Sequence, residues 1–319
     1  MTTLLLSQDI HAEGRKLIDG KFDIIIPGNS QDALLAAVPR AEGIILRVNL
    51  SVTAEVIKAA PRLKIISRTG AGVDNIDLAA ASGRGILVCT QTTANHVSVA
   101  EHAVAMIYCL AKDLFGMDRA IRSGDWKRRN CGRSVELEGK TLGVVGMGHI
   151  GSLVARKCRM GLGMKILAYD PYAADKFRGE DYEFVPDLGR LFAEADFVTI
   201  HCPNSPETKG MISGRLLASM KESSFIVNCA RGGVVDEDAL YNALKDKKIA
   251  GAALDVFSVE PPGLDNPLLG LPNVILSPHS AGMTREAIIR MSTQAAQTVV
   301  DYFSGKKLTN IYNAKDLGL

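Results

Sequence analysis

Residues 141–170, TLGVVGMGHIGSLVARKCRMGLGMKILAYD, constrain the fold of this chain more than any other stretch. An apolar run at 142–145 leads into three glycines, Gly146, Gly148 and Gly151. A helical stretch follows, and a second apolar run at 166–169 ends in Asp170. This order predicts a strand, a glycine turn, a helix and a second strand, which together form one βαβ unit of a parallel sheet.

The three glycines have different tasks in such a turn. Gly146 permits the tight turn, Gly148 lets the backbone approach a pyrophosphate, and Gly151 lets helix and strand pack closely. The free N–H groups at the start of the helix then face the phosphates, where the helix dipole favours negative charge. We therefore expect a dinucleotide in this turn, with His149 and Ile150 among the residues that contact it.

Asp170 lies 19 residues after Gly151, at the end of a predicted strand. A carboxylate at this point can accept both hydroxyls of a ribose and would repel a 2′-phosphate. Asp170 therefore predicts NAD, and not NADP, as the cofactor. A tight turn in any α/β protein could show the same glycines, but the flanking strands and the terminal acid favour the dinucleotide.

Composition limits the class of protein and of partner. The 319 residues suit two domains, and 47% hydrophobic with 23% charged residues is typical of a globular protein. The formal net charge of +2 favours neither nucleic acid nor a membrane surface as partner. The N-terminus lacks the features of a signal peptide, and the six dispersed cysteines form no metal motif, so we expect a cytoplasmic protein without a metal site.

Short apolar strands alternate with helical segments in two series along the chain. The first series predicts strands at 4–6, 22–26, 43–46, 63–67 and 86–89, with helices at 9–20, 30–39, 53–60 and 75–83. The second predicts strands at 142–145, 166–169, 197–200, 225–228, 252–255 and 274–276, with helices at 150–161, 187–193, 213–220 and 236–246. Such alternation predicts parallel sheets with right-handed crossovers.

The fold class predicted is therefore α/β, with two doubly wound parallel-sheet domains. A last helix at 283–303 ends at Gly305, and the tail 311–319 is expected to return to the first domain. This predicts a Rossmann NAD-binding domain, residues 99–284, inserted into a flavodoxin-like substrate domain of residues 1–98 and 285–319. The stretch 98–122 reads as one long helix that is apolar nearly all round, so we expect it to be buried as the hinge and as the contact of a homodimer.

Three segments after the glycine turn end strands in residues that can do acid, base or anion chemistry. Arg231 follows the strand at 225–228, where the carboxyl ends of strands line the ligand crevice and a guanidinium can hold a carboxylate. Its alternative is a structural role in a pair with Asp236, Glu237 or Asp238. Glu260 lies on a loop that two following prolines make rigid, and His279 follows the strand at 274–276 among small residues.

Hydride transfer at the carbon of a 2-hydroxy acid requires these residue types. One group exchanges the hydroxyl proton, a second orients it, and a third holds the carboxylate and polarises the carbonyl. His279, Glu260 and Arg231 match these tasks, and a carboxylate paired with His279 would fix its tautomer and keep the imidazolium available. For the other histidines we expect no catalytic role: His201 is interpreted as a packing residue, and His11, His96 and His102 have no carboxylate in obvious register.

The substrate side is expected in the first domain. The loop RTGAGVD, from Arg68 to Asp74, contains glycines that leave N–H groups free to cradle an anion, and Arg47 ends the neighbouring strand. Two cations there suggest a substrate with a second negative group besides its carboxylate. Solvated or ion-paired arginines are an equally supported alternative.

Four motifs occur here in the order of a known family: GMGHIG with Asp170, NCARGGVVDEDAL, ALDVF with Glu260, and SPHSAG. They resemble the D-isomer-specific 2-hydroxyacid dehydrogenases. The resemblance implies Arg231 as the substrate arginine, Glu260 as the orienting acid and His279 as the acid/base, with Asp255 near the nicotinamide carboxamide. It also implies substrate contacts at Ala71, Gly72 and Val73, and further cofactor contacts at His201, Cys202, Pro203, Thr208, Cys229, Ala230, His279, Ala281 and Gly282.

Within the family, SRTGAGVDNIDL with Arg47 most resembles the branch that acts on 3-phosphoglycerate. Hydroxypyruvate and glyoxylate reductases are the nearest alternative, and other anionic 2-hydroxy acids also remain open as substrates. A remote alternative is an NAD-sensing binding protein like the family's corepressors. The sequence ends before the C-terminal regulatory domain of longer phosphoglycerate dehydrogenases would begin, so a short form is expected.

Overall fold

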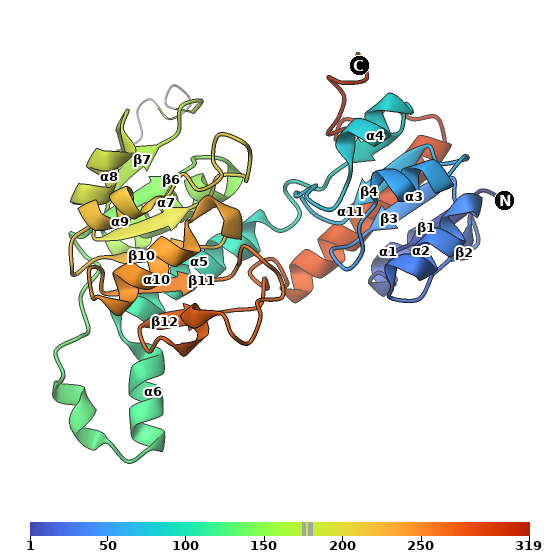
Figure 1. Cartoon of the computed structure of the whole chain (residues 1–319). Coiled ribbons are helices and arrows are strands. Elements are labelled where there is room, and N and C mark those ends of the chain that lie inside the picture. The colour runs from blue at the N-terminus through green and yellow to red at the C-terminus, as the bar shows by residue number, and fades with distance from the viewer. Residues whose placement is uncertain (174–176, 178–180) are drawn as a thin grey trace. The chain divides into compact units, whose positions relative to one another are not determined.

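The computed structural model describes residues 1–173, 177 and 181–319 of the chain. The chain divides into two compact units, one made of Met1–Asn95 with Met283–Leu319 and the other of His96–Gly282 (Figure 1). These divisions lie close to the boundaries expected after residues 98 and 284. None of the described helices combines the length and the hydropathy that crossing a bilayer requires.

The first unit contains a five-stranded parallel sheet in the order β2-β1-β3-β4-β5. Its strands are β1 (Thr3–Leu6), β2 (Asp23–Ile25), β3 (Gly43–Leu46), β4 (Ile65–Arg68) and β5 (Leu87–Cys89). Its helices are α1 (Ala12–Ile18), α2 (Gln31–Ala37), α3 (Ala54–Ala59), α4 (Leu78–Gly83) and α11 (Arg285–Phe303). The strand order is that of flavodoxin-like folds, as predicted.

Side chains that cap the helices explain where several of them begin. Ser30, Thr53 and Asp77 each accept a hydrogen bond from the N–H three residues later, at the starts of α2, α3 and α4. Helices α2, α3 and α4 cover one face of the sheet through a buried apolar cluster, and α1 and α11 cover the other. Because β3 and β4 are parallel, their carboxyl ends leave Arg47 and the loop after Arg68 at the same edge of the sheet.

The C-terminal segment completes this unit. Helix α11 packs so closely on α1 that a Cβ on Gly14 would lie 2.8 Å from the carbonyl oxygen of Ser292. Beyond α11, the tail returns to β5: Tyr312 N–H donates to the Val88 carbonyl at 2.7 Å, and the Asn313 side chain accepts from Val88 N–H at 2.9 Å. The tail therefore belongs to the first unit, as expected from the sequence.

The second unit contains a seven-stranded parallel sheet in the order β12-β11-β10-β9-β6-β7-β8. Its strands are β6 (Thr141–Val145), β7 (Lys165–Tyr169), β8 (Glu183–Phe184), β9 (Phe197–Ile200), β10 (Phe225–Asn228), β11 (Gly251–Leu254) and β12 (Val274–Leu276). Its helices are α5 (His96–Ala111), α6 (Leu114–Arg122), α7 (His149–Leu162), α8 (Leu188–Glu194), α9 (Gly214–Ser219) and α10 (Glu237–Lys245). The order reverses between β6 and β9, which is the switch point where Rossmann folds bind dinucleotides. The two-residue strand β8 was not predicted.

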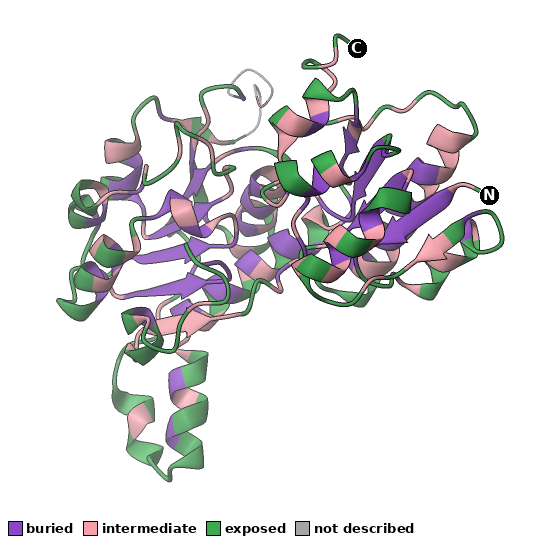
Figure 2. Ribbon diagram, turned by 45° about the vertical axis from the view of Figure 1, so that its right-hand side comes forward, coloured by how far each residue is buried: buried purple, intermediate pink, exposed green. Residues whose placement is uncertain are grey.

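Two apolar layers enclose this second sheet. Helices α5 and α7 pack on one face, and α8, α9 and α10 pack on the other. The inner strands β6, β9, β10 and β11 are buried almost throughout, whereas β12 and β8 at the two edges are only partly buried (Figure 2). Gly143 in β6 is needed for this packing, because a Cβ there would lie 2.5 Å from Leu191 of α8. The predicted α/β architecture of two doubly wound parallel sheets is therefore confirmed.

The prediction of a single helix over residues 98–122 is wrong. Helix α5 ends at Ala111, and α6 begins at Leu114 after Asp113 adopts a left-handed conformation with φ of 48°. The Asp113 carboxylate pairs with Arg128 at 2.6 Å. This salt bridge connects the 3-10 turn that contains Arg128 to the break between α5 and α6. Helix α5 is buried on one face only, and Val97 and Tyr108 are exposed on it, so the expectation of burial nearly all round is also wrong. Helix α6 and the 3-10 turn Trp126–Asn130 form an arm that leaves the sheet (Figure 1), and half of Phe115 is exposed there.

Candidate active site

The turn between β6 and α7 has room for a phosphate where the sequence predicts one. Gly146 has a φ of 92°, and a Cβ there would lie 2.9 Å from the backbone of His201 and Cys202, so this position requires glycine. A Cβ on Gly151 would overlap the carbonyl of Gly146. Gly148 instead faces open space, with no atom within 4 Å of an added Cβ, and as the N-cap of α7 it provides no capping side chain. The first N–H groups of α7 are thus left for an anionic group.

Asp170 lies beside this turn at the end of β7. One of its carboxylate oxygens accepts from Met147 N–H at 2.8 Å, and the other accepts from Tyr172 N–H at 2.8 Å. These bonds hold the carboxylate rigidly against the glycine turn. Since each oxygen of a carboxylate can accept a second hydrogen bond, Asp170 can still bind two ribose hydroxyls. The turn and Asp170 together fit the adenosine and pyrophosphate of NAD.

The segment after β9 forms the other side of the turn. The ring of His201 contacts the Thr199 hydroxyl through Nε2 at 2.8 Å, and burial lowers the pKa of His201 from 6.5 to about 3. His201 is therefore neutral at physiological pH, which agrees with its interpretation as a packing residue. Thr208 donates to the Pro203 carbonyl at 2.6 Å and accepts from Ser205 N–H at 2.8 Å, so the 203–208 loop is internally braced.

His279 and Glu260 are in direct contact. Nδ1 of His279 lies 2.6 Å from Oε2 of Glu260, and Oε1 of Glu260 accepts from Phe257 N–H at 3.0 Å. Burial opposes the charge on Glu260, but the bonds from His279 and Phe257 and the positive charge of Arg231 outweigh it and lower the pKa of this carboxyl. A charged Glu260 holds the Nδ1–H tautomer of His279, which leaves Nε2 as the nitrogen that can exchange a proton.

Arg231 begins the 3-10 turn Gly232–Val234 after β10, and its charge reaches Glu260. Its Nη1 donates to the Ala230 carbonyl at 2.7 Å. Of the acidic residues considered as alternative partners, Asp236 caps α10 by accepting from Ala239 N–H at 3.0 Å. Glu237 accepts from Ser258 N–H, on the loop that carries Glu260. The strand ends of β10, β11 and β12 thus bring the predicted guanidinium, carboxylate and imidazole to the same edge of the second sheet.

Asp255 organises the loop that carries His279. Its carboxylate is almost completely buried, and it accepts from the Ser277 hydroxyl at 2.6 Å, Ser280 N–H at 2.8 Å and Ala281 N–H at 2.9 Å. Its backbone carbonyl accepts from His279 N–H at 2.7 Å. The structure thus connects Asp255 to residues on both sides of His279, through the Ser277 hydroxyl before it and the N–H groups of Ser280 and Ala281 after it. This is in addition to the cofactor contact that the family resemblance implies.

His102 makes a contact that the sequence analysis did not predict. Its Nε2 lies 3.1 Å from the Ser277 hydroxyl and 3.8 Å from Oδ1 of Asp255, a carboxylate that is in no obvious register with it in the sequence. His102 and Ser277 are 175 residues apart. Only the packing of α5 across the second sheet brings them together. No local sequence signal could have revealed this contact, although the buried face of α5 does contain a histidine.

The predicted substrate residues lie in the first unit. Arg68 is buried in its own loop, where it donates to the side chains of Asn75 at 3.3 Å and Thr69 at 3.4 Å. Arg47 is partly exposed and donates to the Asp9 carbonyl at 3.0 Å. Ala71, Gly72 and Val73 follow in the loop after β4, and all three residues are partly exposed. The role of these residues in substrate binding remains a prediction.

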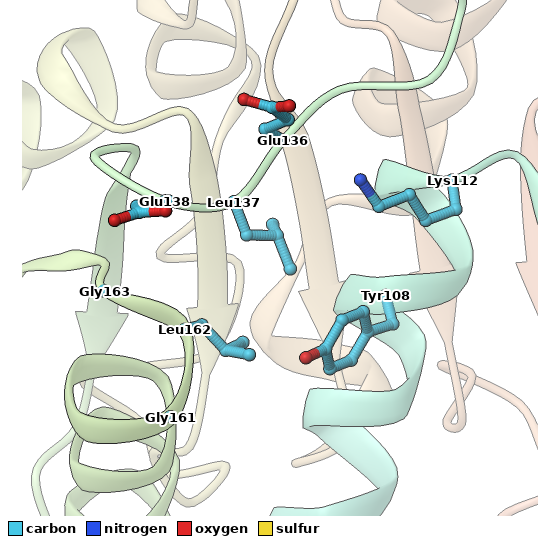
Figure 3. Close-up of a pocket in the computed structure, with 8 residues that line it drawn as sticks. All are labelled: Tyr108, Lys112, Glu136, Leu137, Glu138, Gly161, Leu162 and Gly163. Atoms are coloured by element: carbon cyan, nitrogen blue, oxygen red, sulfur yellow. The ribbon is translucent and has the colours of Figure 1, made fainter.

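A hollow of about 490 Å³ elsewhere on the second unit contains none of the predicted residues. Tyr108 of α5 and Lys112, which directly follows that helix, face Leu137 and Leu162 across it (Figure 3). It is therefore separate from the candidate active site. Among the described residues, no group of three His, Cys, Asp or Glu side chains is placed to hold a metal ion.

Residues 104–281 match the model for the D-isomer specific 2-hydroxyacid dehydrogenase family, NAD binding domain. The chain belongs to this family. The match confirms the resemblance inferred from the four sequence motifs, and it confirms that the glycine turn and Asp170 lie in an NAD-binding domain.

Two curated 2-hydroxyacid dehydrogenases are especially similar to the chain. It is 43% identical to the D-3-phosphoglycerate dehydrogenase of Archaeoglobus fulgidus over 286 residues. This aligned region covers 90% of this chain and 54% of that protein. It is 38% identical over 319 residues to the D-3-phosphoglycerate dehydrogenase of Methanocaldococcus jannaschii, with 99% and 60% covered. The chain thus spans little more than half the length of these relatives.

A solved structure matches the chain over nearly its whole length. The D-lactate dehydrogenase of Aquifex aeolicus, in complex with NAD and lactic acid, is 30% identical with a TM-score of 0.84, over 95% of this chain and 96% of that chain. Relatives with different substrates therefore share this fold, and the family alone does not select the substrate.

Proposed function

We propose that the protein is an NAD-dependent D-2-hydroxyacid dehydrogenase that interconverts 3-phosphoglycerate and its 2-oxo acid. The observation that carries this proposal is the 2.6 Å contact between His279 and Glu260 in the NAD-binding unit. That pair, with Arg231 nearby, supplies the acid/base chemistry that hydride exchange at C2 requires.

Three side chains have separate roles in this mechanism. The glycine turn and Asp170 would hold NAD, which would supply the acceptor or donor of the hydride at C2 of the acid. During oxidation, Nε2 of His279 accepts the proton of the C2 hydroxyl, and during reduction it returns that proton to the carbonyl oxygen. Glu260 keeps the imidazole in the required tautomer and stabilises its protonated form. Arg231 holds the substrate carboxylate and polarises the C2 carbonyl.

The phosphate assignment is supported by two observations. The relatives named D-3-phosphoglycerate dehydrogenase are 43% and 38% identical to this chain. In the first unit, Arg47 is partly exposed after β3, and the Gly70–Val73 loop offers backbone N–H groups to an anion.

A second candidate substrate is a 2-oxo acid without a phosphate, such as hydroxypyruvate or glyoxylate. The engagement of Arg68 by Asn75 and Thr69 favours it, because that guanidinium then braces its own loop. This arrangement places more of the phosphate-binding task on Arg47.

A panel of 2-oxo acids assayed by NADH absorbance distinguishes these substrates. We expect the highest kcat/KM with phosphohydroxypyruvate, and a selective loss with that substrate in Arg47→Ala. Poor turnover of phosphohydroxypyruvate with brisk turnover of hydroxypyruvate or glyoxylate would reject the phosphate assignment. A protein that binds NADH but turns over none of the acids would support a binding protein instead.

We also propose that the protein is a homodimer, with the arm of residues 113–131 as the contact. The arm exposes Leu114, Phe115, Ile121 and Trp126, each by half or more. Exposed apolar side chains that cluster on one segment are typical of an interface. Light scattering of the unsubstituted protein should give the mass of a dimer, and Phe115→Glu with Ile121→Glu should give a monomer. A dimeric double variant would place the contact elsewhere.

A further inference from the structure

Three polar side chains from different elements of the second unit form a continuous chain next to the loop of His279. They are His102 on α5, Ser277 after β12 and Asp255 after β11. Nε2 of His102 lies 3.1 Å from the Ser277 hydroxyl, which lies 2.6 Å from Oδ1 of Asp255. The His102 side chain is 29% exposed, and that of Asp255 only 1%, so the chain runs from partly accessible α5 into the core.

The chemistry of these groups fixes the direction of the hydrogen bonds. A carboxylate can only accept, and a serine hydroxyl has one proton to donate. Ser277 therefore donates its proton to Asp255, and Nε2–H of His102 donates to the oxygen of Ser277. This assigns the Nε2–H tautomer to His102, in which the imidazole directs the serine proton toward the buried carboxylate.

Asp255 connects the hydrogen-bonded chain from His102 to the loop of His279. Its carboxylate also accepts from Ser280 N–H and Ala281 N–H, and its carbonyl accepts from His279 N–H. His279 has a φ of 50°, which is uncommon for a residue with a side chain and persists where surrounding bonds impose it. The bonds to Asp255 flank this residue on both sides. A rotation of the Asp255 carboxylate would therefore move the backbone that aims the His279 ring.

We propose that His102 is a positioning residue, which acts through Ser277 and Asp255 to hold His279 in its catalytic orientation. The proposal rests on the proposed role of His279 as acid/base. His102 does not contact the reacting groups in this mechanism. Its Nε2–H donor, and not the size of its side chain, holds Ser277 and so orients His279. A residue that offers the same donor should therefore replace it.

Kinetics of variants on both sides of the His102–Ser277 bond test this proposal. The substrate is whichever 2-oxo acid the unsubstituted protein reduces fastest with NADH. We expect His102→Ala to lower kcat by about 5- to 10-fold, the worth of one hydrogen bond, with the KM for NADH within about twofold. His102→Gln keeps an N–H donor and should restore most of kcat. Tyr108→Phe on the same helix is the control and should retain the unsubstituted kcat.

A double-mutant cycle shows whether the two side chains act as one unit. Ser277→Ala removes the link to Asp255, so His102→Ala should have little further effect in that background. Fully additive effects would overturn the proposal, as would an unchanged kcat in His102→Ala or failure of His102→Gln to rescue it. If His102→Ala does not fold, the comparison of His102→Gln and Ser277→Ala with the unsubstituted protein carries the same test.

A second measurement does not depend on activity. In protein labelled with ¹⁵N-histidine, long-range correlations of the ring nitrogens should show the Nε2–H tautomer for His102, assigned by its absence in His102→Gln. The Nδ1–H tautomer would overturn the proposal. If the unsubstituted protein reduced no acid at all, the proposed function would fail, while the tautomer would still decide whether the chain from His102 to Asp255 exists.

Discussion

Replacement of Glu260 by Gln tests the central pair of the mechanism with little change in shape. The amide oxygen of Gln can still accept from Nδ1–H of His279, which preserves the tautomer, while the negative charge and the acceptor for Phe257 N–H are lost. Two unit charges about 4 Å apart interact by about 4 kcal/mol near a protein surface. The two side chains are 43% and 35% exposed, and solvent screening reduces this value to about 1–2 kcal/mol. That energy corresponds to a roughly 10-fold lower kcat for reduction, which needs the protonated imidazole.

The assay is kcat for NADH-dependent reduction, measured across pH. Because the pKa of Glu260 is lowered, its carboxylate stays charged through the neutral range in the unsubstituted protein. Glu260→Gln lacks this charge, so its kcat should be about 10-fold lower throughout the neutral range. Glu194→Gln is the control, since it removes the charge of an exposed carboxylate that pairs with Arg190 on α8. A Glu260→Gln protein whose kcat stays within twofold of the unsubstituted value across this pH range would refute this role of Glu260.

Three further predictions concern single residues of the NAD-binding unit. His279→Ala should lower kcat by about 10²- to 10⁴-fold with an unchanged circular dichroism spectrum; near-normal turnover would remove the role assigned to this histidine. Asp170→Ala should lower the ratio of kcat/KM with NAD to that with NADP by roughly 10-fold or more, since the repulsion of a 2′-phosphate is lost; an unchanged ratio would contradict it. The pKa of His201 is about 3 in the folded protein and ordinarily 6.5. As pH drops below 6.5, His201 is therefore protonated in the unfolded chain but not in the folded one, and the free energy of unfolding falls. Between pH 6.5 and pH 5 this loss of stability amounts to about 2 kcal/mol. Urea unfolding should show that His201→Gln loses less stability than the unsubstituted protein over this interval. Equal losses would show that His201 is not buried in its neutral form.

Local patterns were sufficient to predict most of the fold. Alternating apolar runs and helical segments specified both parallel sheets, because strands buried on two faces are apolar throughout and their crossovers are helices. The glycines at 146, 148 and 151 specified the dinucleotide turn, since their task is a property of the backbone at those positions. The short strand β8 escaped prediction because two residues contain no periodicity.

The break between α5 and α6 shows where local pattern fails. The residues around Asp113 are compatible with a continuous helix. The left-handed turn there is stabilised by Arg128, which approaches from the next segment. This salt bridge joins residues 15 positions apart in the sequence, so the periodicity of apolar residues in a helix does not predict it. The apolar residues of α6 therefore became an exposed arm and not a second buried turn of α5.

The sequence by itself determined the residue types of the candidate active site and the strand ends that carry them. Arg231, Glu260 and His279 follow β10, β11 and β12, and parallel strands present their carboxyl ends at one edge. Only the tertiary structure decided how these residues are held: the contact of Glu260 with His279, the bond from Ser258 N–H on the Glu260 loop to Glu237 of α10, and the chain from His102 to Asp255. The physical reason is that hydrogen bonds depend on distance in space, and helix packing joins residues that sequence spacing keeps apart.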